Sequence, residues 1–294
     1  MPVTRTLHFC IPQSFSGQTV LDFMKTRGFT HPVIRLIKKY PDNVLINGNV
    51  ANLWNSVSPG DRLTIHLIEE TSSENIVPSD IPIDIVYEDS DLLVINKPAG
   101  MAIHPSLGHH DDTLGNALMH HFREKGEPFI YRCITRLDMN TSGLVVVARH
   151  IYAASLLYQM MESREITRTY LAICEGKLPE SGKITSPIGR KDGSIIERCV
   201  KDNGDSAVTL YRRLDYKNGY SAALVKLLTG RTHQIRVHFK SLGHPLPGDF
   251  LYNPDYRLID RQALHAFKLS FKHPISGKML AFQAPIPDDM KIFL

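Results

Sequence analysis

The chain has 294 residues, of which 43% are hydrophobic and 22% are charged, and this composition is typical of a globular protein that buries a core. No apolar run approaches the roughly 20 residues that cross a bilayer, and the first residues lack the apolar stretch of a secretory signal, so we expect a cytoplasmic protein without membrane contact. The net charge of +4 permits a nucleic-acid partner without requiring one. The cysteines lack CxxC spacing, which argues against a zinc knuckle or a disulfide scaffold: Cys10, Cys133, Cys174 and Cys199.

Residues 1–70 are expected to form a small α+β module. Apolar residues at helical spacing predict a helix that ends at Gly28 and a second helix over residues 32–40. An apolar strand over residues 44–50 is interrupted by an Asn-Gly turn, and residues 63–68 alternate like a second strand. Two helices followed by a hairpin therefore make up the predicted module.

The outer face of the second predicted helix is basic. It carries Arg35, Lys38 and Lys39, which either contact RNA phosphates or form an ordinary solvated face. Residues 71–80 are polar, show no periodicity and contain a proline, so we expect them to form a linker.

Residues 81–294 are predicted to form a larger domain of strands with a few interspersed helices. Strands at residues 83–87 and 92–96 flank a polar turn, and a second hairpin spans residues 207–228. Thr113 is a candidate helix cap, and a short helix is expected over residues 232–242. Strands joined by hairpins indicate an α+β fold with a mixed, largely antiparallel sheet. No glycine-rich dinucleotide or nucleotide-phosphate loop occurs.

Four blocks in the larger domain combine turn residues with residues suited to chemistry. The first is a Lys-Pro-x-Gly turn over residues 97–100, and the second, over residues 135–143, encloses Asp138 between an arginine and small polar residues. The third places Tyr170 on a basic strand, and the fourth, Thr-Gly-Arg-Thr-His-Gln-Ile-Arg over residues 229–236, leads into a helix. A carboxylate beside cations suits nucleophilic or acid–base catalysis.

In this order the four blocks resemble the RluA-type RNA pseudouridine synthase family, over residues 81–294. The predicted N-terminal module is similar to the alpha-L (S-four-like) RNA-binding module, a companion of this family. The resemblance implies that uridines in structured RNA, ribosomal or transfer RNA, are flipped out and isomerised to pseudouridine. No cofactor, no metal and no obligatory protein partner are implied, and a monomer is expected.

The resemblance also implies roles for individual residues. Asp138 matches the catalytic aspartate, which acts either as a nucleophile toward ribose C1′ or as a base toward C2′. Arg231 matches an arginine that pairs with this aspartate, because a carboxylate shielded from water needs a cation beside it. Tyr170 matches a tyrosine that packs on the target base. Residues expected to contact the substrate or the RNA are Arg136, Leu228, His233 and Arg236, together with Arg35, Lys38 and Lys39 of the module.

Some positions depart from the family pattern, and the residues also allow other functions. Thr135 stands where relatives often have histidine, and Asp205 follows Gly204 where they often have lysine. Both changes concern RNA contacts rather than the reaction. The histidine-rich loop over residues 104–112 lacks the spacing of a catalytic metal site. The remaining alternatives are a glycosidase, for which no second carboxylate is identified, and an inactive RNA-binding or ribosome-assembly factor.

Overall fold

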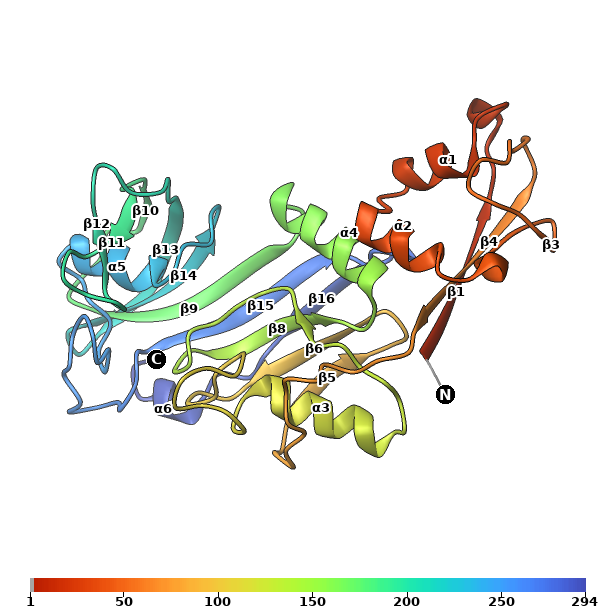
Figure 1. Ribbon diagram of the computed structural model, residues 1–294. Coiled ribbons are helices and arrows are strands. Elements are labelled where there is room, and N and C mark those ends of the chain that lie inside the picture. Colours follow the sequence, from red (N-terminus) through yellow and green to blue (C-terminus); the bar gives the residue numbers. More distant parts are fainter. Residues whose placement is uncertain (1–2) are drawn as a thin grey trace.

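The computed structural model describes residues 3–294 and contains two main sheets, a small one near the N-terminus and a large one in the rest of the chain. Figure 1 shows the N-terminal module at one end of the molecule and the larger domain beside it. The fold is α+β, as predicted: the large sheet is mostly antiparallel and contains one parallel pair. No helix within residues 3–294 is both long and apolar enough to cross a membrane.

The N-terminal module packs two helices on a four-stranded sheet of order β1-β4-β2-β3. Thr19 caps the first helix in a reciprocal capping box with Asp22. Asn47 and Gly48 both have positive φ, as the predicted Asn-Gly turn requires. The elements are β1 (Val3–Cys10), η1 (Gln13–Phe15), α1 (Val20–Thr26), α2 (His31–Ile37), η2 (Pro41–Asn43), β2 (Val44–Ile46), β3 (Asn49–Val50) and β4 (Arg62–Glu69). Strand β1 was not predicted; it pairs along its whole length with β4.

The larger domain is built on a ten-stranded sheet that contains the path β10-β13-β14-β9-β15-β8-β6-β5. Two further strands join it at the side, β16 on β15 and β7 on β8. The strands are β5 (Asp84–Glu88), β6 (Leu92–Lys97), β7 (Arg132–Cys133), β8 (Ser142–Ala148), β9 (Thr167–Glu175), β10 (Ser181–Ile184), β13 (Thr209–Lys217), β14 (Tyr220–Leu227), β15 (Leu264–Lys272) and β16 (Met279–Gln283). A separate ribbon consists of β11 (Ile188–Arg190) and β12 (Arg198–Val200).

Helices cover both faces of the large sheet, so its central strands are buried on both sides. Along β8, residues 144, 146 and 148 join the core cluster that includes α4, while residues 145 and 147 join the cluster that includes α3. This explains the unbroken apolar run of that strand. The helices are α3 (Leu114–Glu124), α4 (Ile151–Glu162), α5 (Gln234–Ser241) and α6 (Asp288–Lys291), and α3 begins at the predicted cap Thr113.

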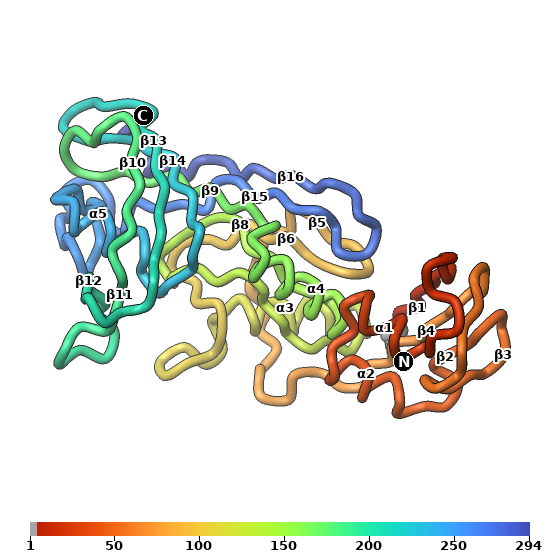
Figure 2. Tube along the Cα trace, turned by 90° about the horizontal axis from the view of Figure 1, so that it is seen from above, coloured from red at the N-terminus to blue at the C-terminus, as the bar shows by residue number. Residues whose placement is uncertain are grey.

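Helix α4 joins the module to the larger domain. Its Tyr152 belongs to the core of the module, where the ring stacks on Phe29 with centroids 4.0 Å apart. Gly28 ends the turn after α1 with φ of +79°, and a Cβ atom there would lie 2.5 Å from Leu156 of α4. Figures 1 and 2 both show α4 between the module and the strands of the large sheet. The other end of α4 reaches the cleft described below, because Met161 lines it.

The segment predicted as a linker is hydrogen-bonded to the larger domain. Ser73 N–H donates to Phe129 O, and Ser79 N–H donates to Asn116 O. A partly buried ion pair adds a second fixed contact: Arg5 of β1 donates to Asp91 at 2.6 Å. The module is therefore tied to the larger domain at more than one point.

Candidate active site

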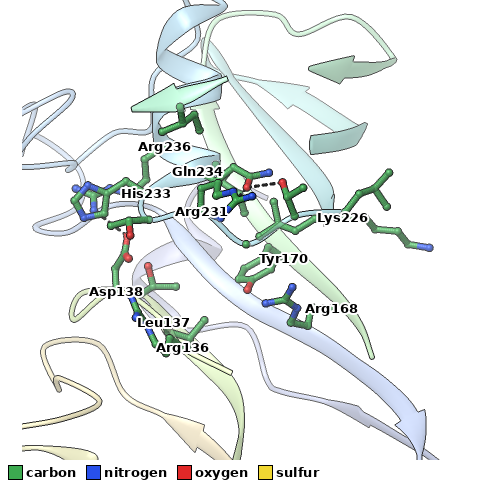
Figure 3. Close-up of a pocket in the computed structure, with 18 of the residues that line it drawn as sticks. Arg136, Leu137, Asp138, Arg168, Tyr170, Lys226, Arg231, His233, Gln234 and Arg236 are labelled. Carbon is green, nitrogen blue, oxygen red and sulfur yellow. Dashed lines mark hydrogen bonds and ion pairs between the residues drawn. The ribbon is translucent and has the colours of Figure 1, made fainter. Parts of the chain in front are cut away.

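A cleft of about 860 Å³ lies where β9, β14, the loop before β8 and the start of α5 meet. Its walls contain eight arginine or lysine residues and two aspartates. Figure 3 shows Asp138 in this cleft, with His233 beside it and Tyr170 and Arg168 across from it. The cations are Arg136, Arg164, Arg168, Arg190, Arg198, Lys226, Arg231 and Arg236. A cleft of this charge is suited to a polyanion.

Backbone hydrogen bonds fix the turn that carries Asp138. The carbonyl of Asp138 accepts from Thr141 N–H at 3.0 Å. The carbonyl of the next residue, Met139, accepts from Lys97 Nζ at 2.9 Å. Lys97 is fully buried and also donates to Pro98 O and Met101 O, so its three donors have three carbonyl partners. Burial lowers the pKa of Lys97 to about 7, although the charge of Asp138 acts in the opposite direction.

Strand pairing brings the second and third sequence blocks together. Ala266 of β15 pairs with Gly143 of β8 on one side and with Tyr170 of β9 on the other. Gly143 has φ of +111°, and a Cβ atom there would lie 2.3 Å from Ala266 O, so this position of the Thr-Ser-Gly motif requires glycine. The turn with Asp138 and the strand with Tyr170 are therefore separated by a single strand.

The cation paired with Asp138 is Arg236, and the expected pairing with Arg231 is wrong. Arg236 lies inside α5 and is 1% exposed; its Nη1 donates to Asp138 Oδ2 at 2.9 Å. Its Nε and Nη2 donate to the two carboxylate oxygens of Asp249, each at 2.7 Å. Burial acts to lower the pKa of Arg236, but the hydrogen bonds with Asp249 and the charge of Asp138 outweigh it and raise that pKa. This guanidinium stays charged and connects a fully buried carboxylate to a partly exposed one.

Arg231 lies before the helix begins, at the rim of the cleft. Its side chain is 42% exposed, with Nη1 3.6 Å from Asp205 and Nε donating to Ser206 O at 3.0 Å. The sequence block contains two arginines five residues apart, and only the second falls in α5, which begins at Gln234 rather than at the predicted residue 232. The first arginine therefore lies at the exposed rim of the cleft and does not pair with Asp138.

The residues between the two arginines set the start of α5. His233 precedes the helix in a left-handed conformation, with φ of 58°, and its Nδ1 is hydrogen-bonded to Tyr252 Oη at 3.0 Å. Burial lowers the pKa of His233, against the effect of the nearby Asp138. Gln234 uses its whole side-chain amide: the oxygen accepts from Thr229 Oγ1 and Arg231 N–H, and the nitrogen donates to Val208 O and Thr209 Oγ1.

Tyr170 forms an aromatic wall of the cleft. Its side chain is 5% exposed, and burial raises the pKa of its hydroxyl, so the hydroxyl keeps its proton at neutral pH. Arg168 lies two residues earlier on β9, and within residues 3–294 its buried Nε has no hydrogen-bond partner. Leu228 and Arg136 also line the cleft, and Arg136 is exposed at its mouth.

The three basic residues predicted on the module lie outside this cleft. Arg35 and Lys38 are exposed on α2 and directly after it. Lys39 forms an ion pair with Glu70, so its positive charge already has a partner within the protein. The module therefore presents two of the three expected cations without a carboxylate partner among the described residues.

The histidine-rich loop does not contain the group of side chains whose spacing would suit a metal ion; that group lies elsewhere in the described residues. In that loop His109 pairs with Asp112, and the two lie 2.7 Å apart. Within the described residues, ligand atoms of Asp89, Asp91 and His273 approach one another within 4.8 Å. Asp91 also accepts from Arg5 and is hydrogen-bonded to His150, so protein side chains already occupy this carboxylate, and the group works as a structural network.

Two supporting residues had no predicted role, Lys97 and Asp249. Both belong to short motifs visible in the sequence, Lys-Pro-x-Gly and Gly-Asp. Nothing in those motifs shows that the lysine binds the carbonyl of Met139 or that the aspartate orients Arg236, because both contacts depend on how separate segments of the fold pack together.

Comparison with known proteins decides the family. Residues 91–241 match the family model described as RNA pseudouridylate synthase. An RNA pseudouridine synthase of Bacillus subtilis is 40% identical over 98% of this chain and 96% of its own length. The chain belongs to the RluA-type pseudouridine synthase family.

Further relatives agree with this assignment. Ribosomal large subunit pseudouridine synthase D of Vibrio parahaemolyticus is 41% identical, and that of Escherichia coli 39%; each comparison covers 84% of this chain and 80% of the relative. Among solved structures, human RNA pseudouridylate synthase domain containing 1 superposes with a TM-score of 0.59 at 30% identity, over 69% of this chain and 83% of that one. The expectation of an RNA pseudouridine synthase enzyme is confirmed, and the alternative of a binding protein without activity is not supported.

Proposed function

We propose that this pseudouridine synthase modifies ribosomal RNA of the large subunit, with Asp138 as the catalytic carboxylate. The target is supported by the relatives named ribosomal large subunit pseudouridine synthase D, at 39–41% identity over most of this chain. The observation that carries the catalytic role is the Asp138–Arg236–Asp249 arrangement in a basic cleft. Transfer RNA is the alternative substrate, and a shared test distinguishes the two.

The reaction is an isomerisation that needs no added atoms. The bond between ribose C1′ and uracil N1 breaks, the base turns, a bond forms from C1′ to C5, and the C5 proton is lost to water while N1 gains one. Asp138 Oδ2 accepts from Arg236, and no other hydrogen bond to this carboxylate occurs within residues 3–294. Oδ1 is thus available to attack C1′ or to take a proton from C2′, and both routes need the same ionised carboxylate.

The remaining walls of the cleft suit a base that has left its helix. A uridine inside folded RNA reaches a carboxylate set in a cleft only by turning out of the stack. Tyr170 and Leu228 supply the surfaces against which the uracil packs, and the Tyr170 hydroxyl, held protonated by burial, donates rather than accepts a proton. Arg136 and Arg231, at the mouth, neutralise phosphates beside the flipped nucleotide.

Tritium release tests the proposal. Large-subunit ribosomal RNA and transfer RNA carrying tritium at uracil C5 are incubated with the protein, without added metal or cofactor. We expect release to water from the ribosomal RNA, and loss of that release by about 10³-fold or more in Asp138→Asn, because the substitution removes the ionised carboxylate.

Asp205→Asn is the matched control, since Asp205 lines the same cleft but is 72% exposed and pairs only with the rim residue Arg231. It should retain nearly full release. Release from transfer RNA alone would overturn the assigned target, and Asp138-independent release would overturn the assigned catalytic residue.

A further inference from the structure

The chain contains a single tryptophan, and it is exposed. Trp54 lies in the loop between β3 and β4 of the N-terminal module with 68% of its surface open to solvent. The large aromatic side chains of α1 and of the segment after it, Phe23 and Phe29, are buried in the same module. A large aromatic side chain left on a surface marks a place where something binds, provided that its position is fixed.

The loop holds Trp54 firmly. Its neighbour Leu53 is 4% exposed in the core of the module, and the Leu53 carbonyl accepts from Leu21 N–H of α1 at 2.9 Å. Trp54 N–H donates to Asn52 Oδ1 at 2.8 Å, and the Asn55 carbonyl accepts from Val20 N–H at 3.0 Å. The backbone is therefore anchored on both sides of the exposed ring, so the ring does not owe its exposure to a loose loop.

A cation lies beside the ring. Lys38 Nζ lies 5.8 Å from the centroid of the Trp54 ring, in cation–π range. Arg35 precedes Lys38 by three residues, so it projects from the same side of α2, and both side chains are exposed. An aromatic face beside two cations suits a nucleobase with its phosphates, because every base offers a π face and every linkage a negative charge.

The site is separate from the cleft but fixed relative to it. Tyr152 near the start of α4 is part of the module core, whereas Met161 near its end lines the cleft. A helix of 12 residues spans about 18 Å. A nucleotide on Trp54 is therefore a different nucleotide from the flipped uridine, held at a set distance along the same RNA.

We propose that Trp54, with Lys38 and Arg35, forms a stacking platform for an unpaired nucleotide of the RNA substrate, remote from the modified uridine. The proposal rests on the proposed RNA substrate and adds a second point of recognition to it. It requires a single-stranded segment, since the bases of a duplex are already stacked on each other.

The fluorescence of the single tryptophan reports on the platform directly. The full chain is titrated with a 12-nucleotide oligocytidylate, which contains no uridine and so cannot be turned over, with an abasic oligomer of the same length and charge, and with a blunt duplex. We expect oligocytidylate to quench Trp54 strongly and the other two to leave it nearly unchanged. Trp54→Ala should weaken oligocytidylate binding roughly 10-fold, and Trp54→Phe should restore most of it.

Tyr216→Ala is the matched control, because Tyr216 is 42% exposed and Lys177 lies 5.8 Å from its ring centroid, the same kind of pair on the larger domain. It should bind like the unaltered protein. Equal quenching by the abasic oligomer, or unchanged affinity in Trp54→Ala, would overturn the platform and assign the exposed ring to a protein partner. None of these readings depends on turnover, so they stand apart from the test of Asp138.

Turnover measurements then test whether the nucleotide bound by Trp54 is remote from the modified uridine. With a long ribosomal RNA fragment, Trp54→Ala should raise KM several-fold and leave kcat unchanged. With a short hairpin that carries only the target uridine, it should change neither value. An effect on kcat with both substrates would contradict a remote platform.

Discussion

Helices α5 and α2 both carry basic residues, but the basic residue that matters in α5 is buried, whereas those on α2 and just after it are exposed. In α5, Arg236 is 1% exposed and holds two carboxylates at hydrogen-bond distance. On α2 and just after it, Arg35 and Lys38 are exposed, with no carboxylate partner among the described residues. A buried guanidinium bonded to two carboxylates fixes the position and charge of a reacting group, whereas exposed cations attract phosphates of any sequence.

Breaking the buried ion pair of Arg236 should have the largest effect. Asp249→Asn removes the carboxylate that accepts from two nitrogens of Arg236. The free energy of unfolding should fall by about 3–5 kcal/mol, because the substitution leaves one member of a buried ion pair without its partner. The guanidinium then shifts against Asp138, and we expect turnover to fall on the order of 100-fold. Urea denaturation and tritium release measure the two effects.

Asp255→Asn in the same loop is the control, because its partner Arg257 is 80% exposed. It should leave stability and turnover close to those of the unaltered protein. Equal losses in the two variants would show that the loop, rather than the buried ion pair, holds the site together.

The pH dependence of stability extends the comparison to a buried group that stays uncharged, unlike Arg236. His265 is 1% exposed, its Nδ1 is hydrogen-bonded to Ser142 Oγ, and burial lowers its pKa to about 4. Between about pH 6.5 and 4 the unfolded chain binds a proton that the folded chain does not, so the free energy of unfolding should fall as the pH is lowered through this range. The loss is at most about 3 kcal/mol, since one pKa unit corresponds to about 1.4 kcal/mol.

Denaturation at several pH values checks this expectation in the unaltered protein and in His265→Gln. The variant should lose this part of the pH dependence and keep the rest. An identical slope in both proteins between pH 6.5 and 4 would assign the dependence to another group.

Removing the exposed cations Arg35 and Lys38 should give the smallest effect. The double variant Arg35→Ala/Lys38→Ala should raise KM for ribosomal RNA roughly 10-fold and reduce the salt dependence of binding by about two counterions, because each phosphate contact releases about one. We expect kcat to stay unchanged. Lys272→Ala/Lys278→Ala, which removes two exposed cations of the β15–β16 hairpin, is the charge-matched control. A fall in kcat would contradict a role in binding alone.

How far the sequence predicted the fold depended on the range of the interactions. Local signals were reliable: the Asn47-Gly48 turn, the Thr113 cap and the hairpin of β13 and β14 within residues 207–228 are found as expected. Strand β1 was missed because its partner β4 lies some 60 residues away and its polar residues hide the alternation. The ribbon of β11 and β12 was missed for a different reason: its partners are close in sequence, but each strand has only three residues, too few to show an alternation.

The site shows the same limit more sharply. The motif predicted that Asp138, Tyr170 and an arginine line one cleft, and the structure brings them there. It did not predict which arginine turns inward, because that depends on the residue at which α5 begins and on Asp249, 13 residues beyond Arg236. Periodicity gives the faces of a helix only after its first residue is known.

The most direct test of the account compares the two arginines of one motif. Single-turnover tritium release is measured for Arg236→Lys and Arg231→Lys with the same ribosomal RNA. We predict a loss of about 100-fold or more for Arg236→Lys, because a compact ammonium lacks the planar, spread donors with which the guanidinium binds Asp249 in two places and also reaches Asp138. We predict a loss of less than about 10-fold for Arg231→Lys, which keeps its charge at the rim. The reverse order would show that Arg231 moves onto Asp138 when RNA binds, and would contradict the assignment of Arg236.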